Sequence, residues 1–283
     1  MQNFTAPGSP PLQESPPRAL ILDMDGVLYH GERAIGGAVE FMNSVRGLPH
    51  LFLTNNPIKA PRNVADKLER IGFKRPGPEQ ILTSAEATAH HLADIKPDFS
   101  FYAIGGEGLH QALSELGQPD NEHADFVVVG EGPGLDFETL TRGINLLLKG
   151  GASLVSTNPD NNVDATVDGC HQVLPGGGAL VAPFAVAAGV QPLTIGKPEP
   201  LMFALALERL GMSAGECLMI GDRPDTDIAG AAAVGMRTAM VRTGRFAPGE
   251  HWPRNLPTPD WDVMDLKQLQ KQLEHAFPGW LNH

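Results

Sequence analysis

A short apolar run that ends in two acids constrains the fold of this chain most strongly. Residues 20–22 are Leu, Ile and Leu, and they lead into Asp23, Asp25 and Gly26. An apolar run bounded by a turn signal is typical of a central strand in a parallel sheet. Because ligands bind at the carboxyl ends of such strands, the acids predict a hard metal ion there. The alternative is an Asp-Gly turn with solvated acids.

Strand and helix patterns alternate along most of the chain, which is typical of a parallel α/β fold. The polar residues at strand ends fall in an early and a late block, and the middle segment lacks them. We therefore expect a core domain formed by residues 18–83 and 190–283, interrupted by an α/β domain formed by residues 84–189. Residues 1–17 contain five prolines and are predicted to be a disordered tail.

Composition argues against several classes of partner. The net charge of −12 disfavours nucleic acid and anionic membranes. The longest apolar stretch, residues 179–190, is interrupted by Pro183 and is too short to cross a bilayer. Cys170 and Cys217 fit no metal or redox spacing, so they read as reduced thiols, although a disulfide is compatible with the sequence. We expect a soluble, cytoplasmic protein.

Polar residues also follow three later apolar runs. Thr54 and Asn55 follow one run, Lys197 follows another, and Asp222 with Asp227 follows a third. Each alone is commonly a turn, a solvated loop lysine or a helix N-cap. Four such ends with complementary chemistry in one chain instead indicate a single site.

Together these groups suit transfer of a phosphoryl group. Asp23 would be the nucleophile and form an aspartyl phosphate. Lys197 would pair with Asp23 and with a phosphate oxygen, while the Thr54 hydroxyl and the Asn55 amide would hold the remaining oxygens. Asp25 is the candidate general acid and base, and crowded anionic surroundings should favour its protonated form.

The same acids offer oxygen ligands for Mg²⁺. Asp23, Asp222 and a backbone carbonyl near Asp25 would hold the ion, which would neutralise charge and align the phosphate. Asp227 lies farther along the same turn as Asp222. It is expected to orient a metal-bound water or Arg223 rather than to bind the ion directly.

Four segments, taken in order, resemble the four signatures of haloacid dehalogenase-like phosphatases. They are Asp-Met-Asp-Gly-Val from residue 23, Thr-Asn-Asn from residue 54, Gly-Lys-Pro-Glu-Pro from residue 196 and Gly-Asp-Arg-Pro-Asp-Thr-Asp-Ile from residue 221. The segment between the second and third resembles the large cap of subfamily IIA. That subfamily includes nitrophenyl-phosphatase, pyridoxal-phosphate, phosphoglycolate and ribonucleotide monophosphatase types.

The resemblance implies a Rossmann-like core with a parallel sheet and helices on both faces, together with an inserted α/β cap of the C2a type. It implies a Mg²⁺-dependent phosphatase that hydrolyses small soluble phosphate monoesters. The implied phosphate contacts are Thr54, Asn55, Asn56 and Lys197. The implied metal contacts are Asp23, Asp25 through its backbone, Asp222 and, in support, Asp227.

Several features stay open at this level. His171 is a candidate substrate contact from the cap, and the alternative is a surface histidine beside a turn. The glycines at residues 176–178 either form a hinge where the cap rejoins the core or bind an anion at a helix N-terminus. Caps in this family often pair into homodimers, but the sequence determines neither the oligomeric state nor the physiological phosphoester.

Two other functions share part of the pattern. A non-catalytic phosphate-binding or phospho-acceptor module also combines acids, Thr and Lys at strand ends. It would leave the long insert unexplained and has no need of the second acid, Asp25. A phosphomutase shares Asp23 and Asp25 but releases no free phosphate.

Overall fold

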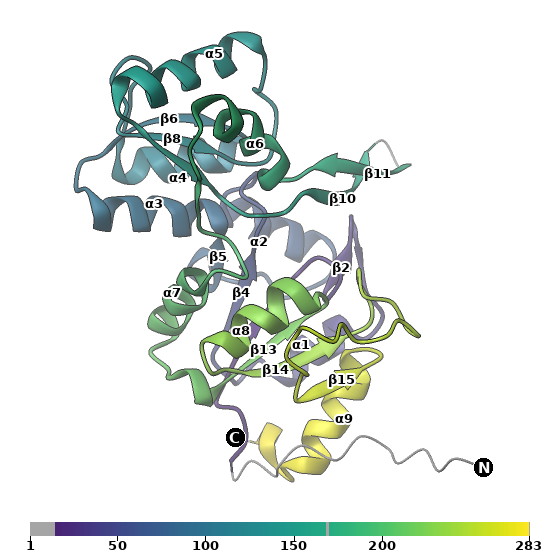
Figure 1. Ribbon diagram of the computed structural model, residues 1–283. Helices are drawn as coiled ribbons and strands as arrows, with labels where there is room; N and C mark the ends of the chain where they lie inside the picture. The colour runs from purple at the N-terminus through teal and green to yellow at the C-terminus, as the bar shows by residue number, and fades with distance from the viewer. Residues whose placement is uncertain (1–14, 168–169, 283) are drawn as a thin grey trace.

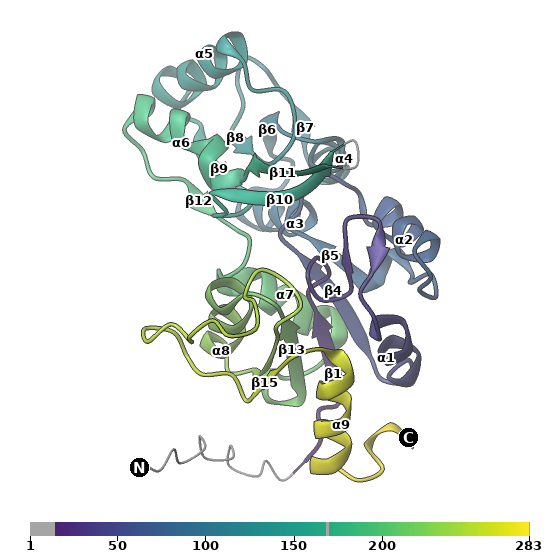
Figure 2. The ribbon, with the colours of Figure 1, turned by 90° about the vertical axis from the view of Figure 1, so that its right-hand side faces the viewer.

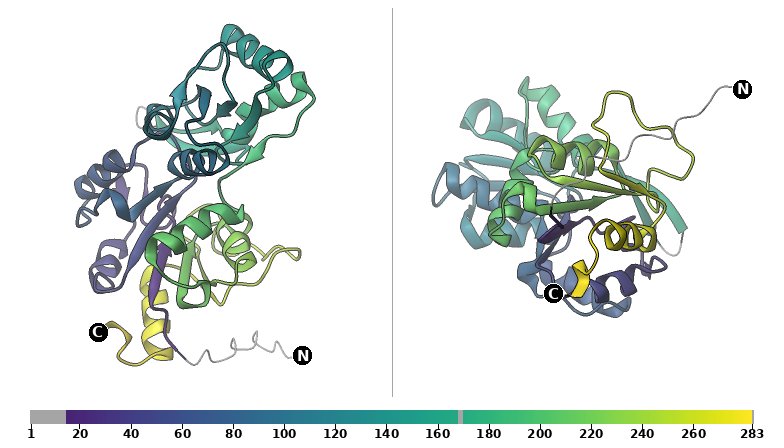
Figure 3. Two further views of the ribbon diagram at one scale, coloured as in Figure 1. Left: turned by 90° about the vertical axis from the view of Figure 1, so that its left-hand side faces the viewer. Right: turned by 90° about the horizontal axis from the view of Figure 1, so that it is seen from below.

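The computed structural model describes residues 15–167 and 170–282. The chain forms two units, each built around a parallel sheet, and passes from the first unit to the second and back again (Figure 1). We call the first unit the core and the second the insert. The C-terminal helix, α9 (Leu266–Ala276, yellow), lies at the side of the core that is farthest from the insert (Figure 3).

Six described strands form the sheet of the core, in the order β15-β14-β13-β1-β4-β5, and all neighbouring pairs are parallel. The strands are β1 (Ala19–Leu22), β4 (His50–Thr54), β5 (Ile81–Thr83), β13 (Cys217–Gly221), β14 (Arg237–Val241) and β15 (Trp261–Val263). Strand β1 lies between β13 and β4, and its residues are buried. The predicted central strand of a parallel sheet is confirmed.

Helices cover both faces of this sheet because alternate strand residues point to opposite sides. Ile21 packs with Phe203 on one face, which is covered by α3 (Ser84–Ile95), α7 (Pro200–Leu210) and α8 (Ala229–Ala233). Leu20 packs with Phe41 on the other, which is covered by α1 (Ala38–Ser44), α2 (Pro61–Arg70) and α9 (Leu266–Ala276). The Rossmann-like arrangement predicted for the core is confirmed.

The insert has a second parallel sheet, in the order β12-β9-β8-β6-β7. Its strands are β6 (Ser100–Ile104), β7 (Gln118–Pro119), β8 (Phe126–Val129), β9 (Ser153–Ser156) and β12 (Leu193–Thr194). One face is covered by α5 (Phe137–Asn145), the π-helical turn Leu146–Gly150 and α6 (Gly177–Ala188), and Phe184 of α6 packs there with Val127 of β8. On the other face, Phe101 packs with α3 and with α4 (Glu107–Leu116) in the apolar cluster that also contains Phe203 of the core.

The last strand of the insert differs from expectation. Leu193 and Thr194 form β12, which pairs with Val155 and Ser156 of β9. The division predicted at residue 190 therefore cuts the second sheet before its edge strand. A two-residue strand carries no local signal for its partner, because pairing between segments distant in sequence is decided by tertiary packing.

Residues 161–171 contain strands that we did not predict. An antiparallel hairpin, β10 (Asn162–Val167) and β11 (Cys170–Pro175), extends from the insert and lies between the two units (Figures 1 and 2). A small ribbon of the core, β2 (Tyr29–His30) and β3 (Arg33–Ala34), follows the first acids. No described helix combines the length and the apolar character that are needed to cross a bilayer.

The end of the predicted tail packs on the core. The Arg237 guanidinium donates hydrogen bonds to the carbonyl oxygens of Ser15 and Pro16, and the Trp280 indole donates to that of Pro17 at 2.8 Å. These three residues were expected to be disordered, but the hydrogen bonds hold them against the core. Their donors lie more than 200 positions away in the chain, so no local pattern predicts them. Residues 1–14 lie outside the described residues.

Candidate active site

Three neighbouring strands of the core end on predicted polar residues. Asp23 follows β1, Thr54 ends β4 and Asp222 follows β13, and parallel strands place these ends at one edge of the sheet. Lys197 reaches the same edge differently, because it follows β12 of the insert and precedes α7. The expectation that Lys197 belongs to a strand end of the core is therefore wrong, although its side chain does reach Asp23.

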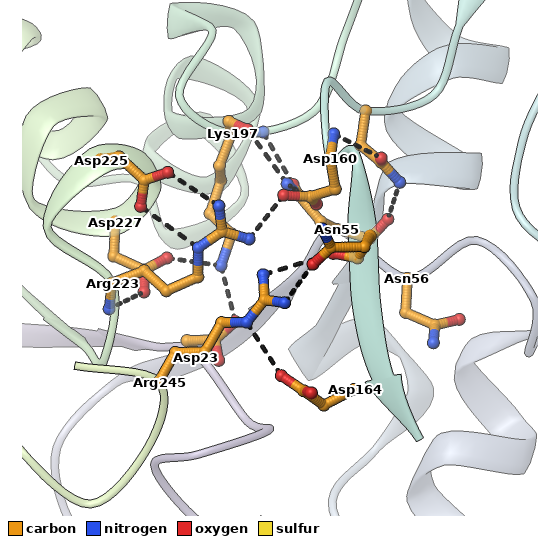
Figure 4. A network of polar contacts seen from close by, with 12 residues as sticks. Asp23, Asn55, Asn56, Asp160, Asp164, Lys197, Arg223, Asp225, Asp227 and Arg245 are labelled. Carbon is orange, nitrogen blue, oxygen red and sulfur yellow. Dashed lines mark hydrogen bonds and ion pairs between the residues drawn. The ribbon is translucent and has the colours of Figure 1, made fainter. Parts of the chain in front are cut away.

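The Lys197 ammonium lies at the centre of the site. Its Nζ is 2.6 Å from Asp23 Oδ1, 2.7 Å from Asp227 Oδ1 and 3.2 Å from the Leu53 carbonyl oxygen (Figure 4). Lys197 is only 2% exposed. Burial alone would lower its pKa, but the two carboxylates hold the pKa above its ordinary value. Lys197 is therefore a permanently charged group at physiological pH.

The carboxylates of the site carry more negative charge than one lysine neutralises. Asp23, Asp222 and Asp227 each place an oxygen within 4.8 Å of the others, and all three are buried. Burial raises the pKa of Asp23 well above its ordinary value, and Asp227 and Asp222 raise it further, against the lowering effect of Lys197. Burial and Asp227 raise the pKa of Asp222 to about 7. Such a set stays ionised most readily when a cation joins it.

Asp227 has a structural task within this set. Its Oδ2 accepts hydrogen bonds from the backbone N–H groups of Asp222, at 3.2 Å, and Arg223, at 3.1 Å. Its Oδ1 pairs with Lys197. Asp227 lies in a π-helical turn, Pro224–Ile228, that brings its side chain back over the end of β13. It therefore fixes the turn that carries Asp222.

Two glycines allow the backbone to approach Asp222. A Cβ on Gly244 would lie 1.9 Å from Asp222 Oδ2, and one on Gly26 would lie 2.5 Å from the same oxygen. Gly26 also has a φ of 83°, a left-handed conformation that favours glycine. The backbone N–H of Arg245 donates to Asp222 Oδ2 at 2.8 Å. Asp222 is therefore held in place from both sides.

Asp25 lies apart from the buried carboxylates and lines the cavity between core and insert. Asp25 is exposed to the cavity, but partial desolvation there raises its pKa from the ordinary value; Lys67 and His30 oppose this, and Asp164 of the insert adds to it. The direction agrees with our expectation, but the cause differs, because we had assigned it to crowded anionic surroundings. Lys67 is itself held 3.6 Å above the Tyr29 ring.

The loop after β4 is held mainly by Asn55. The Asn55 side chain pairs with the backbone of Lys197: Oδ1 accepts its N–H at 2.8 Å, and Nδ2 donates to its carbonyl at 3.0 Å. Thr54 Oγ1 accepts the Asn56 N–H at 3.1 Å, and Asn56 Oδ1 accepts the Ile58 N–H at 2.9 Å. The Asn56 side chain lies away from Lys197 in Figure 4. The structure thus brings Thr54 and Asn55 to the site and leaves the Asn56 amide at its edge.

A cavity of about 690 Å³ opens onto these residues. The core contributes Asp23, Asp25 and Lys67 to its wall, and the hairpin of the insert contributes Val163 and Leu174. His171, the candidate substrate contact, lies on β11 and pairs with Thr166 of β10, but its side chain lies outside the described part of the chain.

Comparison with known proteins places this arrangement in a family. The profile of haloacid dehalogenase-like hydrolases matches residues 20–118, and a second HAD-hydrolase-like profile matches residues 194–269. An acid sugar phosphatase of Staphylococcus aureus is 38% identical over 261 residues, which cover 91% of this chain and 98% of the relative. This chain belongs to the haloacid dehalogenase-like hydrolase family. It is a phosphatase, as the named relatives are.

Solved structures of related phosphatases share this architecture. The p-nitrophenyl phosphatase from Archaeoglobus fulgidus is 26% identical, with a TM-score of 0.81, and the match covers 91% of this chain and all of the relative. The glycerol phosphate phosphatase of Mycobacterium tuberculosis, solved in complex with magnesium, is 30% identical, with a TM-score of 0.78. That match covers 89% of this chain and 76% of the relative.

Two arginines of this phosphatase join core to insert: Arg223, which we expected only as a group that Asp227 would orient, and Arg245, which we did not assign to the site. Arg223 contacts Asp160 of the insert at 2.5 Å and Asp225 at 2.8 Å. Arg245 contacts Asp164 of β10 at 2.8 Å. Both pairs are drawn in Figure 4. Arg223 lies within a signature segment, but its partner is 63 positions away, so only the folded chain identifies its role.

Glu131 is a second site residue that we did not predict. It is 2% exposed, lines the cavity and accepts a hydrogen bond from Asn158 Nδ2 at Oε1, 2.9 Å away. The backbone N–H of Gly177, at the start of α6, lowers the pKa of this carboxyl group, against the larger effect of burial. The three glycines at residues 176–178 pack against residues 158–160, where a Cβ would clash. A carboxyl group of the protein itself therefore faces this helix N-terminus.

Replacement of Glu131 by Gln should change how stability depends on pH. Burial raises the Glu131 pKa from 4.5 to about 7, so between these values the folded protein keeps a proton that the unfolded chain has lost. The free energy of unfolding therefore falls as pH rises through this window, by up to about 3 kcal/mol. Glu131→Gln should lack this contribution and gain stability relative to wild type from pH 4.5 to 8.

Urea unfolding of both proteins in EDTA at several pH values measures the difference. Other acids of the site titrate in both proteins, so the comparison isolates residue 131. Parallel pH profiles for wild type and Glu131→Gln would contradict the prediction.

Proposed function

We propose that this phosphatase hydrolyses small phosphate monoesters with Mg²⁺, through an aspartyl phosphate on Asp23. The observation that carries the proposal is the 2.6 Å contact between Lys197 Nζ and Asp23 Oδ1, at the wall of a cavity and within a cluster of buried acids. A lysine held beside a carboxylate supports attack on a phosphate, because it neutralises both the nucleophile and the oxygens of the transferred group.

The donor set fits a hard divalent cation. Its ligand atoms are carboxylate oxygens, which Mg²⁺ prefers, and their raised pKa values reflect charge that Lys197 alone does not balance. Both Asp227 oxygens are engaged by Lys197 and by backbone N–H groups. Asp23 and Asp222 would therefore hold the ion together with the Asp25 carbonyl, and Asp227 would support them. When bound, the ion would neutralise the acids and align the phosphate.

Each polar residue of the site has a separate role in the proposed reaction. Asp23 attacks phosphorus and breaks the ester bond, while Lys197, the Thr54 hydroxyl and the Asn55 N–H hold the phosphate oxygens. Asp25 donates a proton to the leaving alcohol and afterwards removes one from the water that attacks the phosphoenzyme. Its raised pKa and its position on the cavity wall support this role.

The insert would act as the cap over the site. The hairpin β10–β11 forms part of the cavity wall, so the substrate is enclosed between both units. The volume of about 690 Å³ suits small soluble phosphoesters such as sugar phosphates. We keep His171 as a candidate contact to the substrate headgroup, and cytoplasmic localisation as a proposal from the composition.

Hydrolysis of p-nitrophenyl phosphate tests the proposal. We expect turnover with Mg²⁺ and loss of at least nine-tenths of it in EDTA, with recovery when Mg²⁺ is restored. Undiminished turnover in EDTA would contradict metal dependence. A phosphoenzyme that persists for hours would indicate a phospho-acceptor, and phosphate transfer without release would indicate a phosphomutase.

Substitution of Gly244 by Ala should weaken the metal site. The added Cβ would lie 1.9 Å from Asp222 Oδ2, so the carboxylate must move. We expect the Mg²⁺ concentration for half-maximal activity to rise about 10- to 100-fold, with a smaller effect at saturating Mg²⁺. Gly36→Ala is the matched control, because a Cβ there meets nothing within 4 Å. An unchanged Mg²⁺ requirement in Gly244→Ala would show that Asp222 does not bind the ion.

A further inference from the structure

The insert contacts the loop after β4, which carries Asn55, through a network of buried polar groups. Asn158 is fully buried, and its Nδ2 donates to two acceptors at 2.9 Å, the Asn55 carbonyl oxygen of the core and Glu131 Oε1 of the insert. Its Oδ1 accepts the Asp160 N–H at 3.1 Å. Both hydrogens of the amide are thus used, and its orientation is determined.

Asn55 carries this network to Lys197. It pairs with both the backbone N–H and the carbonyl of Lys197, and its Nδ2 also donates to Asp160 Oδ2 at 2.9 Å. The insert therefore holds Asn55 at two points, the carbonyl through Asn158 and the amide through Asp160. Residues of the insert therefore hold Asn55, and Asn55 holds the peptide group of Lys197.

Close backbone packing leaves this network little freedom. A Cβ on Gly196 would lie 2.6 Å from the Thr157 carbonyl oxygen and 2.8 Å from Asn55 Oδ1. Residue 196 precedes Lys197, so the insert chain lies directly against the backbone that carries the lysine. A shift of the segment around Asn158 must therefore move Lys197 or Asn55.

From this geometry we infer that Glu131 and Asn158 are positioning residues for Lys197. Glu131 orients the Asn158 amide, Asn158 fixes Asn55, and Asn55 fixes the Lys197 peptide. The insert then does more than cover the substrate, because it sets the position of a charged group in the core. This inference rests on the proposed function, since it concerns how Lys197 holds the phosphate.

One oxygen of the buried Glu131 carboxyl group explains its role in this network. Among the described residues, its Oε2 has no hydrogen-bond partner, while Oε1 receives Asn158. An uncharged amide in place of the acid keeps an acceptor for Asn158, whereas an aliphatic side chain removes it and leaves a buried N–H unsatisfied. The acceptor atom, rather than the charge, is therefore the feature that matters for position.

Four variants test the inference with p-nitrophenyl phosphate and Mg²⁺. We expect Asn158→Ala and Glu131→Leu to lower kcat about 10- to 100-fold and to raise the inhibition constant of inorganic phosphate by a similar factor. Glu131→Gln should restore most of the activity that Glu131→Leu loses. Thr157→Val is the matched control, because the Thr157 hydroxyl is buried without a partner in the described structure.

The readouts separate positioning from general destabilisation. A positioning role raises the phosphate inhibition constant by a larger factor than the Mg²⁺ concentration for half-maximal activity, because the network reaches Lys197, which pairs with Asp23, but does not include Asp222. Losses no larger than those of Thr157→Val would overturn the inference, as would losses that disappear when variants are assayed well below their melting temperatures. An inactive wild type would overturn the proposed function instead.

Discussion

Asp23→Asn should reduce turnover of p-nitrophenyl phosphate by about 10,000-fold or more, which is the scale seen when a catalytic nucleophile is removed. The substitution keeps the shape of the side chain but removes the charged oxygen that would attack phosphorus. Lys197 keeps its second partner, Asp227, at 2.7 Å. We therefore expect the variant to remain folded and inactive, with no phosphoenzyme after acid quench.

The stability of the same variant provides an independent check. Burial and neighbouring acids raise the Asp23 pKa well above its ordinary value, so the charged form is disfavoured in the metal-free protein. Neutralisation of Asp23 should leave the free energy of unfolding in EDTA unchanged or higher. Asp94→Asn, an exposed position on α3, is the control for removal of one carboxylate. Substantial remaining turnover in Asp23→Asn would exclude Asp23 as the nucleophile.

Lys197→Met should lose both activity and stability. Removal of the ammonium leaves Asp23 and Asp227 buried beside each other without a cation. Loss of one partner of a buried ion pair costs about 3–5 kcal/mol. Turnover should fall about 1,000-fold, because the phosphate loses the positive charge that holds it during transfer. Urea unfolding and steady-state kinetics measure the two effects.

A second substitution separates these two consequences of Lys197→Met. In Lys197→Met/Asp227→Asn one of the two stranded acids is neutral, so part of the lost stability should return. Activity should stay low, because the phosphate still lacks the ammonium. Wild-type stability of Lys197→Met, or recovery of activity in the double variant, would contradict this account of the lysine.

The core and the insert hold each other in place through reciprocal polar contacts. Arg223 and Arg245 are core residues that hold the insert, and Asn158 and Asp160 are insert residues that hold the core. Arg245 also donates its backbone N–H to Asp222. The contacts that place the insert over the cavity are thus the same contacts that surround the proposed metal and phosphate positions.

The sequence by itself determined the core sheet and the residues at its edge. Apolar runs end at or just before Asp23, Thr54 and Asp222. Parallel strands bring such ends together at one edge of the sheet, regardless of the conformation of the connecting loops. A local pattern therefore predicted a long-range cluster. The helices were predicted from apolar residues that repeat with helical spacing, and the family resemblance implied that they cover both faces of the sheet.

Only the tertiary structure decided where the insert touches this edge. Lys197 follows a strand of the insert, the hairpin β10–β11 closes over the cavity, and Glu131 reaches Lys197 through two asparagines. These contacts join segments that are up to about 140 positions apart, as for Asn55 and Lys197. No periodicity within a segment encodes its partner in another, because such pairings depend on how two units pack together.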